Sequence, residues 1–99
     1  MLNEQNKNLC WQILAKYGCE SQLTMVIEEC AELQKAVCKI HRDDGHVTEQ
    51  HDADFREELI DTIVMCQQML LMLKISMDEV NQRAHDKMVR ALGGESEKH

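Results

Sequence analysis

The sequence predicts an all-α protein, a bundle of four helices that oligomerisation completes. Proline is absent from its 99 residues, glycine occurs four times, and Met, Leu, Ile, Val, Glu, Gln and Lys dominate, a helix-forming composition. A chain of this length makes one domain and buries a small core, which burial between subunits would extend. We therefore expect one helical domain over residues 1–94 and a disordered tail over residues 95–99.

The first helix is predicted from Glu4 to Tyr17. Asn3 stands before it as an N-cap, because its side chain can accept a hydrogen bond from a free backbone N–H group. Gly18 ends it, since glycine readily adopts the left-handed conformation that follows many helices. The residues at helical spacing that form its expected buried stripe are Leu9, Ile13 and Tyr17.

The second helix is expected to start after Ser21 and to continue to about Ile40. Its apolar residues keep a helical period throughout. They are Leu23, Ile27, Cys30, Leu33, Val37 and Ile40. The following stretch, HRDDGHVTEQHDAD, has clustered Asp, one glycine and no periodic apolar residue, so it predicts a loop over residues 41–53.

The third helix is expected from near Asp54 to about Lys74. From Leu59 onward it is apolar nearly all round, as the sequence LIDTIVMCQQMLLMLKI shows. Such a pattern is typical of a helix that is buried on several sides. In so small a chain, it indicates an interface between subunits.

The fourth helix is predicted to run to about Leu92. Ser76 and Glu79 have the spacing of a capping box at its start, and Gly93–Gly94 stops it. One face carries basic residues at positions i, i+4 and i+7, which are Arg83, Lys87 and Arg90. Alone, this basic stripe is ordinary helix surface, but beside a carboxylate–metal site it is a candidate for gripping phosphate oxygens.

Carboxylates interrupt the apolar pattern of the two central helices. Glu29 and Glu32 are three residues apart, as are Glu58 and Asp61, and residues with this spacing project from one face of a helix. Two helices packed side by side could therefore aim four carboxylates into one space. In an antiparallel hairpin, the two pairs would meet only if the second helix overhangs the third, which a long loop permits.

Four clustered carboxylates need compensation. Two of them about 5 Å apart repel by roughly 3 kcal/mol at an effective dielectric of about 20. No Lys or Arg lies within residues 26–34 or 57–72, so a divalent cation is the expected partner. Oxygen ligands select Mg²⁺, with Mn²⁺ as a substitute. The neighbouring Glu28 and Glu57 are expected to be solvated charges.

Charge and composition narrow the class of protein further. The net charge of −7 argues against a nucleic-acid polymer as partner, although a nucleotide held through metal ions remains compatible with it. The longest apolar run is too short to span a bilayer, and the first residues lack the apolar segment of a signal peptide. These features predict a soluble, cytoplasmic protein with no membrane partner. Reduced, buried thiols are expected for Cys10, Cys19, Cys30, Cys38 and Cys66.

Three motifs together resemble the MazG-like nucleotide pyrophosphohydrolases, the all-α NTP pyrophosphatases. They are E-E-x-x-E (Glu28, Glu29, Glu32), E-x-x-D (Glu58, Asp61) and a late K-x-x-R (Lys87, Arg90). The resemblance covers about residues 18 to 92 and is greatest for the short single-domain members of bacteria and their phages. It implies a Mg²⁺-dependent enzyme that cleaves nucleoside triphosphates to the monophosphate and pyrophosphate, a reaction suited to housecleaning of the nucleotide pool. It also implies intertwined homodimers, often paired into homotetramers.

The resemblance also implies roles for particular residues. Glu28 would orient the attacking water or join a further metal, and Lys87 would contact phosphate, with Arg90 as a further contact. Arg83 is a candidate for phosphate binding only as a member of the basic stripe. The metal ligands would be Glu29, Glu32, Glu58 and Asp61. Trp11 is a candidate for stacking on the base, or else a core residue. The ending RALGGE and the long 41–53 loop depart from the family and bear on substrate preference.

Three other interpretations compete with this one. A di-iron four-helix protein requires E-x-x-H pairs, and no histidine here has a glutamate three residues before it. A non-catalytic helical interaction module, such as a degenerate family member, would have the same helices without metal-dependent turnover. The histidines of the loop could bind a transition metal, or could be polar surface. They are His41, His46 and His51.

Overall fold

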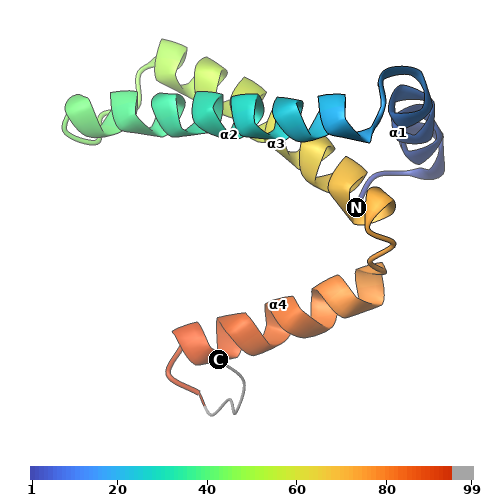
Figure 1. Ribbon diagram of the computed structural model, residues 1–99. Coiled ribbons are helices and arrows are strands. Elements are labelled where there is room, and N and C mark those ends of the chain that lie inside the picture. The colour runs from blue at the N-terminus through green and yellow to red at the C-terminus, as the bar shows by residue number, and fades with distance from the viewer. Residues whose placement is uncertain (95–99) are drawn as a thin grey trace.

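A computed structural model describes residues 1–94, which form four α-helices and no strand. The helices are α1 (Glu4–Tyr17), α2 (Cys19–Arg42), α3 (Glu49–Met72) and α4 (Met77–Ala91). In Figure 1, α2 and α3 form an antiparallel hairpin, α1 lies across its open end, and α4 lies apart below it. The predicted all-α class is confirmed, while the predicted tail over residues 95–99 lies outside the described part of the chain.

The helix caps follow from local sequence. The Asn3 side chain accepts a hydrogen bond of 2.9 Å from the Asn6 backbone N–H, and α1 ends at Gly18, whose φ of 89° favours glycine. The Ser76 hydroxyl accepts a hydrogen bond of 3.1 Å from the Glu79 backbone N–H at the start of α4. The predicted ends of α1 and start of α4 are therefore confirmed.

The predicted limits of the two central helices are wrong. Helix α2 begins directly after Gly18 and continues through Arg42, so it is longer than predicted at both ends. Helix α3 begins at Glu49 because Thr48 caps it, its hydroxyl accepting a hydrogen bond of 3.0 Å from the His51 N–H. The predicted loop of 41–53 is therefore only residues 43–48. The first turns of α3 are polar, so they carry no apolar period that could have revealed a helix.

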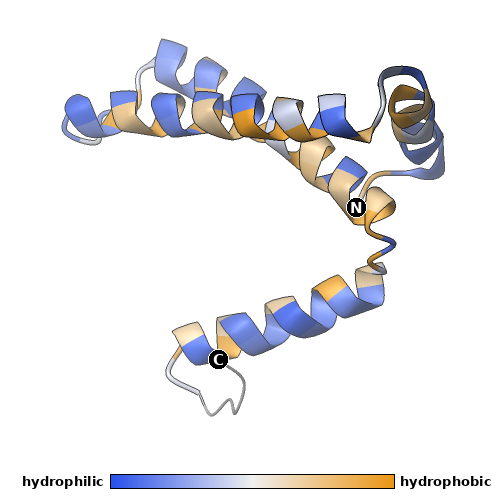
Figure 2. Cartoon of the chain, viewed as in Figure 1, coloured by the Kyte–Doolittle hydropathy of each residue, from blue (hydrophilic) through white to orange (hydrophobic). Residues whose placement is uncertain are grey.

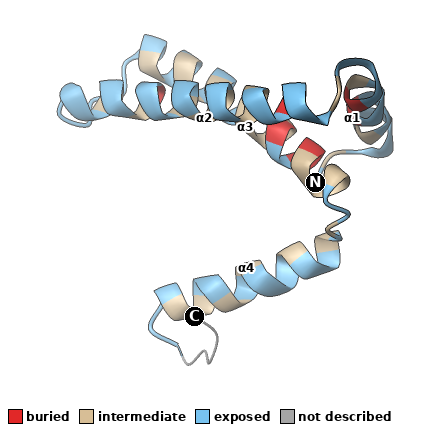
Figure 3. Ribbon diagram, in the orientation of Figure 1, coloured by how far each residue is buried: buried red, intermediate tan, exposed pale blue. Residues whose placement is uncertain are grey.

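The core lies where α1 meets the hairpin, as the buried residues in Figure 3 show. It contains Cys10, Leu14 and Met65, together with the polar residues Gln22, Gln67 and Gln68. Ala36 is also buried, but it lies further along α2, towards the connecting loop. The buried stripe predicted for α1 is wrong, because α1 buries Cys10 and Leu14 while Leu9 and Tyr17 are about half exposed. Each buried residue of α1 follows a predicted one by one position, so the hairpin covers a neighbouring face of this helix.

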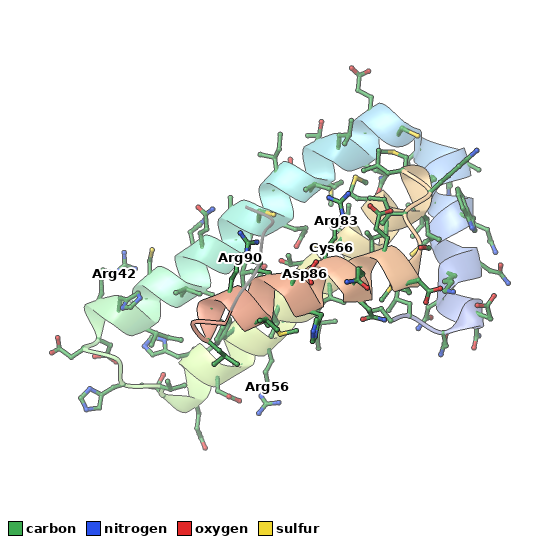
Figure 4. All side chains as sticks on the ribbon, turned by 90° about the horizontal axis from the view of Figure 1, so that it is seen from below. Arg42, Arg56, Cys66, Arg83, Asp86 and Arg90 are labelled. Atoms are coloured by element: carbon green, nitrogen blue, oxygen red, sulfur yellow. The ribbon has the colours of Figure 1, made fainter. Side chains whose placement is uncertain are left out.

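The expectation of buried cysteines also fails for most of them. All five thiols are free, but only Cys10 is buried and Cys30 is intermediate. Burial raises the pKa of the Cys10 thiol, so this group stays protonated over a wider range of pH. The exposed thiols are Cys19, Cys38 and Cys66, the last of which is labelled in Figure 4.

A single chain does not close a four-helix bundle. Within residues 1–94, no Cα atom of α4 comes within 8 Å of another helix, and α4 buries no residue. Apolar side chains stay exposed on α3 and α4, including Ile60 at 60% and Met88 at 59%. Figure 2 shows this apolar character along the second half of α3 and in patches on α4.

No single helix within residues 1–94 is long and apolar enough to cross a membrane. Helices α3 and α4 pass that test only as a pair, joined across a bend of 119°, and only by length and composition.

Candidate metal centre

The hairpin brings acidic residues from α2 and α3 into one cluster. Glu29 of α2 and Glu58 and Asp61 of α3 each offer a carboxylate oxygen, and these oxygens lie within 4.8 Å of one another. We call these three residues the acidic triad. The Thr62 hydroxyl donates a hydrogen bond of 2.8 Å to the Glu58 carbonyl and lies 3.5 Å from the Glu29 carbonyl, so it sits between the two backbones. Each side chain of the triad is partly buried.

The two acidic motifs meet because of where α3 begins. Glu58 follows the first residue of α3 by nine positions, and Glu32 precedes the last residue of α2 by ten. Both motifs therefore lie at nearly the same distance from the connecting loop. The overhang of the second helix that the sequence led us to expect is not needed, because α3 is longer at its start than predicted.

One oxygen of the triad lacks a partner. Oε2 of Glu29 is buried and has no hydrogen-bond partner among the described residues. A buried carboxylate oxygen without a donor is unfavourable, because it has lost water and gained nothing in return. A cation at the triad would supply the missing interaction, so the residues present fit a metal ion.

The carboxylates of the triad also shift one another's ionisation. The pKa of Glu29 is raised first by burial, and then by the nearby carboxylates of Asp61, Glu32, Glu28 and Glu57. Burial is likewise the largest cause of the raised pKa of Glu58, followed by the charges of Asp61, Glu29, Glu32 and Glu57. Both shifts show that charge on the cluster is disfavoured when no cation is present.

Glu32 and Glu28 border the triad and are not part of it. Both are exposed, as expected for Glu28, and Glu57 is exposed as well. The Glu32 carboxylate accepts a hydrogen bond of 3.3 Å from Nζ of Lys35, one residue beyond the stretch that the sequence analysis found free of basic residues. An exposed ion pair of this kind contributes at most about 1 kcal/mol. The pairing therefore does not prevent Glu32 from turning towards a cation, and its role as a ligand stays a prediction.

The basic stripe of α4 is not packed against the triad. Arg83 forms an ion pair of 3.0 Å with Glu79 of the same helix, and Lys87 is exposed. In Figure 4, α4 crosses the hairpin in projection, with Arg83 and Arg90 labelled on it, whereas Figure 1 shows that α4 and the hairpin are well separated. Within residues 1–94, the predicted phosphate-binding residues therefore lie on a helix whose Cα atoms are all more than 8 Å from the helices that carry the predicted metal ligands.

Trp11 and the three histidines of residues 41–51 lie outside the triad, and of these histidines only His46 is in the loop, since His41 is on α2 and His51 on α3. The Trp11 side chain is 48% exposed on α1, so its stacking role stays a prediction. Nε2 of His51 lies 3.3 Å from Oδ2 of Asp43, and Nδ1 of His46 lies 2.9 Å from the Asp43 carbonyl oxygen. Across residues 1–94, the triad is the one group of three or more metal-binding side chains found close together, and it contains no histidine.

Three buried polar residues outside the triad were not expected from the sequence. Gln22, Gln67 and Gln68 are all buried. Gln67 and Gln68 interrupt an apolar helix just as Asp61 does, and that interruption was the signal that could have revealed them.

Comparison of this chain with protein-family models, with curated proteins and with solved structures gives no match. The resemblance to the MazG-like enzymes therefore stays a prediction that rests on the motif residues.

Proposed function

We propose that this protein is a Mg²⁺-dependent nucleoside triphosphate pyrophosphohydrolase, which converts an NTP or dNTP to the monophosphate and pyrophosphate. The observation that carries the proposal is the acidic triad, with the buried and unpaired Oε2 of Glu29 within it. An all-oxygen set of ligands from two helices suits a hard divalent ion, with Mn²⁺ as a possible substitute for Mg²⁺.

The chain's own residues divide the work of this reaction. Glu29, Glu58 and Asp61 would hold the cation, and Glu32 would join them after leaving Lys35. A divalent ion held there would supply positive charge to offset the phosphates and would lower the pKa of a bound water. Glu28 precedes Glu29 and is exposed beside the triad, so its carboxylate would orient the attacking water and accept its proton.

The proposal includes a homodimer or homotetramer in which α4 of one subunit reaches the triad of another. Two features support it: no Cα atom of α4 lies within 8 Å of another helix within residues 1–94, and apolar side chains of α3 and α4 are exposed. Lys87, with Arg90 and Arg83, would then bind phosphate oxygens across the interface. The net charge of −7 is consistent with a cytoplasmic enzyme that binds neither nucleic-acid polymers nor membranes.

A second candidate function is a non-catalytic helical interaction module. The exposed apolar faces and the unpacked α4 favour it, because both are surfaces on which another helix could dock. Such a module would bind its partner without metal-dependent turnover.

The deciding experiment is an assay of an NTP and dNTP panel with Mg²⁺ or with EDTA, which measures pyrophosphate and orthophosphate separately. We expect Mg²⁺-dependent pyrophosphate release from at least one nucleotide, and loss of that release in Glu58→Gln. Glu57→Gln is the matched control, because Glu57 is the adjacent, exposed carboxylate outside the triad. Orthophosphate with a diphosphate product would contradict the assigned cleavage position, and absence of turnover would favour the interaction module.

A further inference from the structure

A cavity of about 410 Å³ lies at the junction of α1, α2 and α3. Its walls include Ile13 and Tyr17 of α1, Gln22 and Met25 of α2, and Met65 and Gln68 of α3. This volume falls within the range of small-molecule sites, and mostly apolar walls with few polar groups are typical of them. The cavity is separate from the triad and from the basic stripe of α4.

Gln68 is the polar group in this cavity that most needs a partner. It is the most buried of the three buried glutamines, at 1% exposure, and its Oε1 has no hydrogen-bond partner in the described chain. Its neighbour Gln67 is also buried, but Oε1 of Gln67 accepts a hydrogen bond of 3.2 Å from the Leu2 backbone N–H. Of these two adjacent amides, the one that lines the cavity is the one whose carbonyl lacks a donor.

The cavity is in register with the triad along the hairpin. Met25 lies four residues before Glu29, and Met65 lies four residues after Asp61, so each is about 6 Å along its helix from the triad. Gln68 lies seven residues beyond Asp61, or about 10 Å. This separation is comparable with the span from the phosphate to the far edge of the base in a nucleotide.

We infer that this cavity binds the base of the nucleotide, with Oε1 of Gln68 accepting a hydrogen bond from an N–H group on the base edge. The inference rests on the proposed function for the phosphates, which would lie at the triad. Met25 and Ile13 provide apolar contacts for the faces of the ring, and the half-exposed Tyr17 lies at the mouth. A base without an N–H group leaves the Gln68 carbonyl unpaired, so it binds more weakly.

The test uses nucleosides without metal, because they probe the cavity and not the triad. The full chain in EDTA is titrated with adenosine, guanosine, cytidine, uridine and thymidine, and binding is followed by saturation-transfer NMR. Purine riboside and 3-methyluridine are added as analogues that lack the N–H group of adenosine and uridine. We expect at least one nucleoside to bind at millimolar concentration, and an analogue that lacks the N–H to bind about tenfold more weakly. Gln68→Met replaces the amide by an apolar chain of similar length. Its affinity for the nucleoside should be lower than that of the wild type by about the same factor.

A second variant covers the possibility that Gln68→Met folds poorly. Ser21 lines the cavity and is exposed, so Ser21→Trp should fold and block the mouth. Ala53→Trp places the same side chain on an exposed position of α3 far from the cavity, and should bind like the wild type.

The inference would be overturned if no nucleoside bound, or if Ser21→Trp bound nucleosides as well as the wild type. It would also be overturned if Ser21→Trp changed only the oligomer mass, because the cavity would then hold a side chain of a second copy. Nucleoside binding without hydrolysis of any triphosphate would leave the inference standing and contradict the proposed function. Hydrolysis of all triphosphates at equal rates without nucleoside binding would contradict the inference and leave the proposed function standing.

Discussion

The α2–α3 hairpin and helix α4 carry the two charged features of this protein, and they differ in how a single chain positions them. The hairpin places three carboxylates within 4.8 Å of one another through contacts between neighbouring helices. Helix α4 carries the basic stripe, and within the described residues none of its Cα atoms comes within 8 Å of α1, α2 or α3. A single chain therefore assembles the acidic half of the proposed site, but it does not bring the backbone of the basic half beside it.

The largest expected effect comes from breaking the acidic half. Asp61→Asn should reduce Mg²⁺-dependent turnover by more than about a hundredfold, since even residues that only support a metal ligand reach that range. The metal-free variant should melt at the same temperature as the wild type or higher, because one of the mutually repelling charges is gone. Thermal melts with and without Mg²⁺ check both points, since Mg²⁺ should stabilise the wild type and hardly affect the variant. A variant that melts lower in both conditions would indicate a structural role for Asp61.

Breaking the basic half should have a smaller effect. Lys87→Ala should lower kcat/KM by about ten- to a hundredfold, as expected for loss of a charged contact to phosphate, with little change in melting temperature because Lys87 is exposed. Lys39→Ala removes an exposed lysine from α2 and is the matched control. If Lys87→Ala turns over at the wild-type rate, the stripe is ordinary helix surface.

Mixing the two variants tests whether the halves come from different chains. If α4 of one subunit completes the triad of its partner, a dimer of Asp61→Asn with Lys87→Ala contains one intact site. An equal mixture, after subunit exchange, should regain about a quarter of the wild-type activity, as random pairing in a symmetric dimer gives. A mixture as inactive as its components would place both halves of the site in the same chain.

A single substitution of an exposed apolar residue should weaken the proposed association between subunits. Ile60 is 60% exposed in the single chain, so Ile60→Lys should leave the fold of the monomer intact while weakening association. Light scattering should give the wild type a multiple of 11.5 kDa, and the variant a lower mass at the same micromolar concentration. A wild-type mass of one subunit would contradict the proposed oligomer.

The smallest expected effect is on the pH dependence of the metal-free fold. The pKa values of Glu29 and Glu58 are raised in the folded state, so the folded chain holds more protons than the unfolded chain at pH values between the ordinary and the raised pKa. Folding stability should therefore fall as the pH rises through that window, and the contribution is most favourable on its acid side. Urea unfolding in EDTA over this range should show a shallower fall for Glu29→Gln than for the wild type. Added Mg²⁺ should bind more tightly as the pH rises, because its ligands must be deprotonated.

Part of the acidic site was predictable because a helix has a regular geometry. The i, i+3 spacing of Glu58 and Asp61 places both on one face, and their position in an apolar helix predicts that this face packs against something. The pairing of Glu32 with Lys35 follows from the same i, i+3 spacing within α2. The unpaired carbonyl of Gln68 was not predictable, because it depends on which neighbours the packed helices place around it.

The sequence by itself determined the features that depend on residues close together in the chain. Asn3 and Ser76 cap their helices because each reaches a backbone N–H three residues away, and the all-α class follows from a composition rich in helix formers. The start of α3 at Glu49 has the same local cause, the cap at Thr48, although its polar first turns carry no apolar period that would reveal it. Only the tertiary structure decided which face of α1 is buried and that α4 lies apart, because both depend on contacts between residues far apart in the chain. The apolar pattern shows which residues can be buried, but the packing of the helices selects which of them are.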